Sequence, residues 1–197
     1  MSDFKKTRTC ENLMKAFAGE SQARNRYTYY ASSARKEGYR QIEAIFMETA
    51  DNEKEHARVF FKHLLEKLQD HLPAALDINA AYPVAKGTTL DNLNAAAAGE
   101  NEEWTILYKN FSEIAREEGF SEIAHSFEMI AQVEKRHEAR YLKLAENMEK
   151  GKVFKKEEEV RWKCRNCGYI HEENKAPDKC PACEHGQEHF EVFVETY

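Results

Sequence analysis

The sequence lacks any long apolar run, and it has no excess of positive charge. None of its 197 residues lie in a stretch approaching the ~18 apolar residues that span a bilayer, so we expect no membrane segment. The start, MSDFKKTRTC, lacks the apolar core of a secretory signal, which favours a cytoplasmic protein. Lys and Arg total 29 against 35 Asp and Glu, which argues against nucleic acid as a partner. No GxGxxG nucleotide fingerprint occurs, so any NAD(P)H would be oxidised by a partner protein.

Cysteine is scarce, and its placement is uneven. Four of the five cysteines form two CxxC pairs near the C-terminus: Cys164 with Cys167 in CRNCGY, and Cys180 with Cys183 in CPAC. In a reducing compartment this pattern predicts a tetrathiolate metal site rather than disulfides. Zinc and iron both occupy such sites. Cys10 lies outside both pairs, and we expect it to be a packed thiol rather than a ligand.

Most of the remaining chain has the apolar periodicity of amphipathic helices. Gly38, Gly119 and Gly151 are typical of residues that follow a helix C-terminus, and Thr88 with Asp91 forms a capping pair. The pattern predicts four helices, at about residues 9–36, 40–68, 89–117 and 121–150. From residue 152 onward the composition shifts to Cys, Gly, Pro and scattered aromatics, so we place a domain boundary near Gly151.

The helical part contains an internal repeat. ARKEGYRQIEAIFMETADNEKEH at 34–56 aligns with AREEGFSEIAHSFEMIAQVEKRH at 115–137, an offset of 81, and AGE at 18–20 recurs at 98–100, an offset of 80. About 20 residues separate the two copies, which is long enough to cross a whole bundle. The sequence therefore predicts an all-α four-helix bundle with one long crossover, the connectivity of ferritin-like folds.

Acidic residues interrupt the inward, otherwise apolar stripe of every predicted helix. Two matching ExxH motifs, Glu53 with His56 and Glu134 with His137, lie on the second and fourth helices. An isolated ExxH arises by chance, and a lone buried Glu often pairs with Arg or Lys, but the repetition argues against both explanations. The full inward set is Glu20, Glu53, His56, Glu100, Glu103, Glu134 and His137.

Such a cluster requires compensating positive charge. Desolvating one carboxylate costs several kcal/mol, so we expect two divalent or trivalent cations among these side chains. A Glu from each of two helices plus ExxH from the other two is the ligand set of di-iron and di-manganese bundles. Carboxylate and imidazole ligands suit iron or manganese better than copper.

One ligand has no counterpart in the repeat. Glu103 aligns with Ala23, so the third helix carries a carboxylate that the first lacks. A surplus ligand would let a metal exchange partners as its charge changes. We therefore hypothesise that Glu103 and His56 compete for the same ion.

Taken together, the chain closely resembles the rubrerythrin family. The resemblance covers nearly the whole sequence and rests on six motifs: FAGESQARNRY, EKEH, AAGENEEW, EKRH, CRNCGY and CPAC. It implies a ferritin-like di-iron bundle in residues 1–151. It also implies a small rubredoxin-like iron domain of short β-strands and loops in residues 152–197.

The resemblance also assigns roles to single residues. It implies that His56 joins the iron pair on reduction, and that Tyr27 and Tyr108 hydrogen-bond to the iron-binding carboxylates. The ligands implied for the oxidised pair are Glu20, Glu53, Glu100, Glu103, Glu134 and His137. Those implied for the single iron are Cys164, Cys167, Cys180 and Cys183.

The activity implied by the resemblance is reduction of hydrogen peroxide to water, as part of oxidative-stress defence. Electrons would arrive singly through the tetrathiolate iron, from rubredoxin or an NAD(P)H-dependent reductase. A homodimer or larger homo-oligomer is implied, in which the tail of one chain serves the bundle of another. Two other readings stay open: a ferroxidase or iron-storage bundle, and a non-enzymatic zinc-ribbon module.

Overall fold

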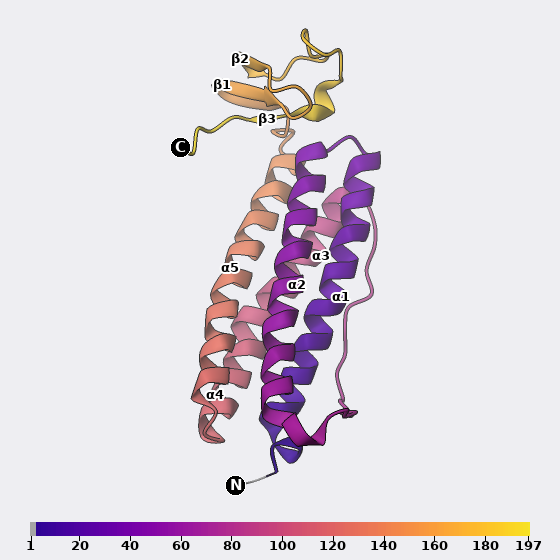
Figure 1. The fold of residues 1–197 in the computed structure, drawn as a ribbon. Coiled ribbons are helices and arrows are strands. Elements are labelled where there is room, and N and C mark those ends of the chain that lie inside the picture. Colours follow the sequence, from indigo (N-terminus) through magenta and orange to yellow (C-terminus); the bar gives the residue numbers. More distant parts are fainter. Residues whose placement is uncertain (1–2) are drawn as a thin grey trace.

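The structure, a computed structural model, describes residues 3–197. Four helical rods form an elongated bundle, and a small β domain sits on one end of it (Figure 1). The rods are α1 (Arg8–Lys36), α2 (Arg40–Leu68), α3 (Thr89–Glu102) continued by α4 (Tyr108–Glu117), and α5 (Ser121–Glu149); short 3-10 helices, η1 (Phe4–Lys6) and η2 (Gln69–His71), precede α1 and follow α2. The predicted four-helix bundle is confirmed, and the predicted ends of its rods lie within one residue of the observed ends.

The two hairpins of the bundle close with the same turn. Gly38 between α1 and α2 has φ +81°, and Gly119 between α4 and α5 has φ +87°, a left-handed conformation that glycine adopts without steric cost. The N–H groups of the next residues, Tyr39 and Phe120, each donate to the carbonyl five residues earlier, at 2.8 and 2.7 Å. The sequence repeat is therefore also a repeat of local structure.

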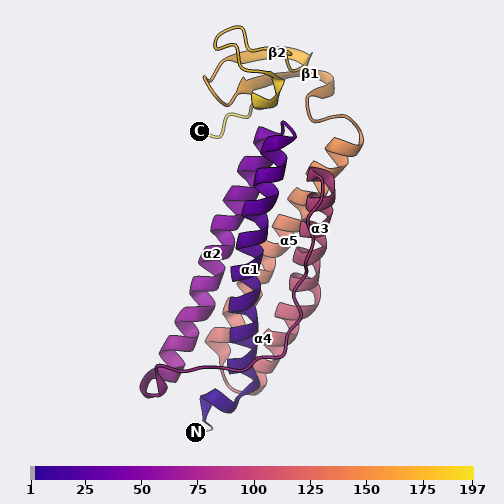
Figure 2. The ribbon, with the colours of Figure 1, turned by 90° about the vertical axis from the view of Figure 1, so that its right-hand side faces the viewer.

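The crossover between the hairpins runs the full length of the bundle (Figure 2). Residues 72–88 form no helix or strand; they cross the lower end of α1 and then run up the outside of the bundle beside α1 and α3. The hydroxyl of Tyr82 donates to the carbonyl of Lys15 on α1 at 2.8 Å, which ties the segment to that helix. At its end, Thr88 and Asp91 form the predicted capping box.

A π-helical turn, η3 (Glu103–Leu107), interrupts the third rod, where the sequence predicted one continuous helix. The repeat explains the interruption. Glu20 matches Glu100 at an offset of 80, whereas Tyr27 matches Tyr108 at an offset of 81, so the second copy has one additional residue between these positions. A π turn holds more residues than an α turn, so it absorbs the insertion without breaking the rod.

The core of the bundle is divided into two apolar clusters. The cluster nearer the β domain includes Tyr27, Phe46 and Tyr141, and the other includes Leu13, Phe60 and Phe127. Four of the inward carboxylates lie between the two clusters and are at most 1% exposed: Glu20, Glu53, Glu100 and Glu134. Among residues 3–197, no helix combines the length and the apolar character that crossing a membrane requires.

The small domain is a three-stranded antiparallel sheet with strand order β2-β1-β3. Its elements are β1 (Lys155–Cys164), β2 (Ile170–Lys175), the 3-10 helix η4 (Gln187–His189) and β3 (Phe190–Val192). Trp162 is fully buried in its core, and its Nε1 donates to the carbonyl of Glu173 at 3.0 Å. Tyr39 of the α1–α2 turn stacks on Phe154, with ring centroids 6.1 Å apart. The predicted domain of short strands and loops is confirmed.

Candidate metal centres

Two overlapping groups of potential ligands lie in the middle of the bundle. The ligand atoms of each group lie within 4.8 Å of one another. One group is Glu20, Glu53, His56 and Glu134, and the other is Glu53, Glu100, Glu134 and His137. Glu53 and Glu134 belong to both groups, so they are placed to bridge two ions. The structure thus brings together six of the seven inward residues that the sequence analysis singled out.

Several of the converging ligand atoms have no hydrogen-bond partner. The Nδ1 atom of His137 lies 2.8 Å from Oε2 of Glu134 and 3.2 Å from Oε1 of Glu53. Despite these distances, His137 Nδ1, Glu53 Oε1 and both carboxylate oxygens of Glu134 are buried without a hydrogen-bond partner. Buried polar atoms are normally satisfied. A pair of cations between these atoms fits the donor set, because it would give each of them a partner.

The imidazole of His137 is oriented by a second helix. Its Nε2 donates to Oδ1 of Asn52 on α2 at 3.3 Å, which leaves Nδ1 facing the carboxylates. The Nδ1 atom of His56 faces the same space, 2.9 Å from both Glu53 and Glu134. Sequence reasoning missed Asn52. Its only signal was its position directly before Glu53.

Two tyrosines fix the carboxylates of the first and third rods. Tyr27 on α1 donates to Oε1 of Glu100 at 2.5 Å, and Tyr108 at the start of α4 donates to Oε1 of Glu20. Burial, followed by the charges of nearby carboxylates, raises the pKa of both tyrosines well above the usual value. Both phenols therefore stay protonated and act as donors.

Without metal, the cluster retains protons. Burial, and then the charge of Glu53, raises the pKa of Glu100 to about 8. Burial alone would also raise the pKa of Glu53, but the imidazoles of His137 and His56 outweigh it and lower that pKa to about 2. Conversely, burial would lower the pKa of His137, but the surrounding carboxylates raise it to about 12. Metal binding therefore has to displace protons from this site.

Glu103, the surplus acid, lies apart from both groups. It is the first residue of the π turn, lines a cavity between α1 and the crossover, and is partly exposed. Loss of most of its hydration, and then the charges of Glu20 and Glu100, raises its pKa well above the usual value. If His56 and Glu103 compete for one ion, two arrangements must exist, one with each residue among the ligands. The structure has the first: His56 belongs to a ligand group and Glu103 does not.

Side chains of α3 and η3 tie the π turn to α5. The Nε1 atom of Trp104 donates to Glu138 Oε2 at 2.5 Å, and Asn101 donates to Glu138 Oε1 at 2.9 Å. The ammonium of Lys135 lies 4.9 Å from the centre of the Trp104 ring. Since Glu138 directly follows His137, this contact holds the turn that carries Glu103 beside a ligand. The sequence offered no signal for it, because the π turn sets the direction of Trp104.

Removing the metal pair is expected to lower the thermal unfolding midpoint by roughly 10 °C. Ions bound tightly only to the folded state add about 3 kcal/mol of stability, and each kcal/mol shifts the midpoint of a chain this long by about 2–4 °C. Calorimetry of metal-loaded protein and of protein stripped by a chelator measures the difference. Equal midpoints would contradict a metal role for the buried carboxylates.

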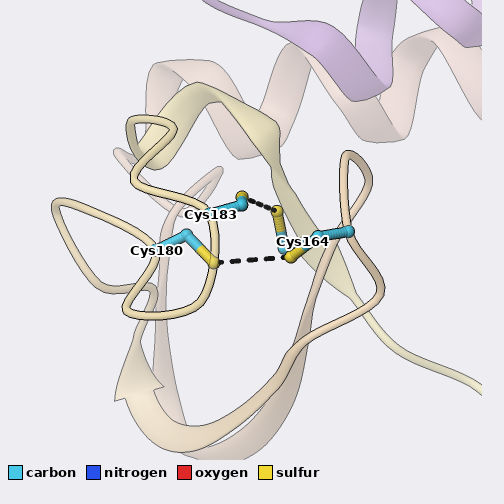
Figure 3. A group of neighbouring side chains, drawn as sticks. Cys164, Cys180 and Cys183 are labelled. Atoms are coloured by element: carbon cyan, nitrogen blue, oxygen red, sulfur yellow. Dashed lines mark hydrogen bonds between the residues drawn. The ribbon is translucent and has the colours of Figure 1, made fainter.

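The four clustered cysteines come from the end of β1, the turn after it and the loop between β2 and η4; Figure 3 labels three of them, Cys164, Cys180 and Cys183. The Sγ atoms of Cys164 and Cys183 lie 3.7 Å apart, as do those of Cys167 and Cys180. A tetrahedral ion with metal–sulfur bonds of about 2.3 Å has sulfur–sulfur edges of about 3.8 Å. The spacing therefore fits one tetrathiolate metal.

The cysteines differ in acidity according to their surroundings. A hydrogen bond from the backbone N–H of His185 lowers the pKa of Cys183 to about 6, which favours the thiolate that a metal binds. Cys10 is buried in the bundle, and burial raises its pKa to about 11. Within residues 3–197 it belongs to none of the potential metal-ligand groups and packs in the apolar cluster of Leu13, Phe60 and Phe127, so it is a packed thiol, as expected.

Known proteins share both parts of this arrangement. Residues 11–145 match the profile of the family "Rubrerythrin", and residues 162–191 match "Rubrerythrin, rubredoxin-like domain". The chain is 59% identical to the rubrerythrin of Clostridium perfringens over the full length of both chains. It is 49% identical to that of Nitratidesulfovibrio vulgaris, over 98% of each. A solved structure of partially reduced nigerythrin covers 98% of this chain and 94% of its own, with TM-score 0.63 and 29% identity.

Proposed function

The chain belongs to the rubrerythrin family, and from that premise we propose that it reduces hydrogen peroxide to water. Its cofactors are a pair of non-haem iron ions in the ferritin-like bundle and one iron in the rubredoxin-like tetrathiolate site. The observation that carries the proposal is the presence of two buried, overlapping ligand groups and a one-electron iron site in the same chain. A domain boundary near Gly151, where α5 has ended, separates the two functions.

The proposed ligands follow from the two groups. In the reduced protein, His56, Glu20 and the shared Glu53 and Glu134 hold one ion, and Glu100 and His137 complete the other. In the oxidised protein Glu103 would hold that ion in place of His56. Held by these residues, a ferrous pair would supply the two electrons that reduction of the O–O bond consumes.

The protein itself positions the carboxylate ligands and excludes bulk water from them. Tyr27 and Tyr108 hold Glu100 and Glu20 in fixed orientations through their hydroxyl donors. The two apolar clusters flank the metal ligands and keep bulk water away from them. This exclusion strengthens the electrostatic interactions among the ligands. The π turn leaves Glu103 partly exposed at the wall of a cavity, where its carboxylate would have space to move toward or away from the ligands.

Electrons are proposed to enter through Cys164, Cys167, Cys180 and Cys183. Rubredoxin or an NAD(P)H-dependent reductase would reduce this iron, because the sequence has no GxGxxG nucleotide fingerprint of its own. Within one chain, Glu53 lies 13 residues along α2 from Arg40, which corresponds to about 20 Å of helix beneath the small domain. A homodimer in which the tail of one chain approaches the bundle of the other would shorten that path.

Oxidation of the reduced protein tests the proposal. Iron-loaded protein is reduced without oxygen and mixed, in stopped flow, with stoichiometric hydrogen peroxide or dioxygen while the visible absorption of the ferric centre is followed. Peroxide is expected to oxidise the centre fast and dioxygen slowly. Fast reaction with dioxygen, and growth of a ferric mineral when ferrous iron is added in excess, would instead indicate a ferroxidase or storage protein.

A further inference from the structure

A cavity of about 300 Å³ lies between α1, the crossover and the π turn. Gly19 and Arg26 line it on the α1 side, and Tyr82 lines it on the crossover side. The missing side chain of Gly19 leaves space there: a Cβ atom at this position would meet only Tyr82, at 3.7 Å. The reduction of hydrogen peroxide requires no space of this size.

The inner wall of the cavity belongs to the metal site. Glu103 and Tyr108 both line it, and Tyr108 donates to the ligand Glu20. Glu20, Glu53, Glu100 and Glu134 are each at most 1% exposed, whereas Glu103 is partly exposed. The cavity therefore gives solvent access to a carboxylate that is proposed to exchange on and off the iron pair.

The size and the walls of the cavity suit a small organic molecule. A volume of about 300 Å³ lies at the lower end of the range for ligand pockets, ~300–1,000 Å³. Tyr82, Pro83, Leu107 and Phe111 supply apolar surface. The Nη1 atom of Arg26 is buried without a hydrogen-bond partner, so it is a donor available to a ligand oxygen.

We propose that this cavity is the substrate entrance and that it admits organic hydroperoxides, R–OOH, as well as hydrogen peroxide. The organic group lies against Tyr82 and Phe111, and the peroxide group points toward Glu103. The O–O bond breaks, two protons from solvent and two electrons from the reduced iron pair are consumed, and the alcohol R–OH and water leave. The inference rests on the proposed peroxide reduction and specifies its substrate class.

The first test uses a substitution on the exposed crossover that narrows the cavity. Ala81→Trp places a large ring at the cavity wall, and Ala75→Trp places the same ring elsewhere on the crossover, in an apolar groove away from the cavity. Steady-state assays of iron-loaded protein use cumene hydroperoxide and hydrogen peroxide. Ala81→Trp is expected to lower kcat/KM for cumene hydroperoxide by about tenfold or more, with a smaller effect for hydrogen peroxide, and Ala75→Trp to change neither.

A second pair of variants changes Gly19, which lines the cavity on the α1 side. Gly19→Ala adds one methyl group in ordinary contact with Tyr82, whereas Gly19→Leu fills the space. Of these two variants, only Gly19→Leu is expected to lower kcat/KM for cumene hydroperoxide more than kcat/KM for hydrogen peroxide. Independently of turnover, crystals of the iron-loaded protein soaked in the product alcohol, 2-phenyl-2-propanol, are expected to hold it beside Tyr82.

Three results would overturn the inference. Wild-type protein that reduces hydrogen peroxide but not cumene hydroperoxide would refute the substrate class and leave the proposed function standing. Equal effects of the cavity variants and their controls, or alcohol bound elsewhere, would refute the entrance. Wild-type protein that reduces neither peroxide would remove the proposed function and this inference together.

Discussion

Replacing Glu134 by alanine is expected to remove both iron ions from the bundle and to lower peroxide reduction by more than about 100-fold. Glu134 belongs to both ligand groups, it is fully buried, and neither of its carboxylate oxygens has a hydrogen-bond partner. Residues that merely orient a metal ligand contribute about 10–100-fold to affinity or activity, so loss of a ligand shared by two ions exceeds that range. Iron analysis, the visible spectrum and steady-state assays measure the change.

Two further variants show whether the effect is specific. Glu128→Ala, also on α5, removes a partly exposed carboxylate that accepts from Ser112 at 2.9 Å, and it is expected to keep all of its iron. Glu100→Ala removes a member of only one group and is expected to affect one ion more than the other. A Glu134→Ala protein that retains two bundle irons would refute the shared-ligand geometry.

The bundle was predictable because two independent signals agreed. Apolar periodicity placed each rod and its inward stripe, and the repeat showed that Glu53 and Glu134 recur at one position. A buried acid at one site has many explanations, whereas the same acid in both copies has few. The roles of individual ligands and the domain boundary near Gly151 stay predictions, because they depend on bound iron and on independent folding.

The π turn was missed although the sequence contains its trace. The repeat offset changes from 80 at Glu100 to 81 at Tyr108, which marks one inserted residue. Helical periodicity read with a fixed step of 3.6 residues hides such an insertion, and it predicts a continuous helix through Glu103. A change of repeat offset inside a helix is therefore a usable signal for a π turn.

Contacts between the rods could not be predicted from the sequence, for a different reason. The hydrogen bond from His137 to Asn52, and those from Asn101 and Trp104 to Glu138, depend on how helices are rotated against one another. Apolar periodicity predicts which face of a helix is buried. It does not predict which residue of an adjacent helix lies beside a side chain at the edge of that face. The cavity beneath the crossover likewise depends on the path of a segment without regular structure.

Removing one cysteine from each CxxC pair, as Cys167→Ala with Cys183→Ala, is expected to stop turnover without stopping the chemistry. The tail then lacks two of four thiolates and cannot hold a tetrahedral tetrathiolate ion. Steady-state reduction of hydrogen peroxide with NAD(P)H, a reductase and rubredoxin is expected to fall at least about 100-fold, beyond the range of indirect ligand effects. The red colour of the tetrathiolate iron disappears as well.

A single turnover separates electron supply from peroxide cleavage in the same variant. When the bundle irons are reduced chemically and mixed with one equivalent of hydrogen peroxide, their oxidation is expected to proceed at the wild-type rate, because neither cysteine lies in the bundle. Cys10→Ala, which changes a buried thiol outside the cluster, is expected to keep both the colour and the steady-state rate. Undiminished steady-state turnover in the double variant would mean that the donor reduces the bundle directly, and that the tetrathiolate iron has another purpose.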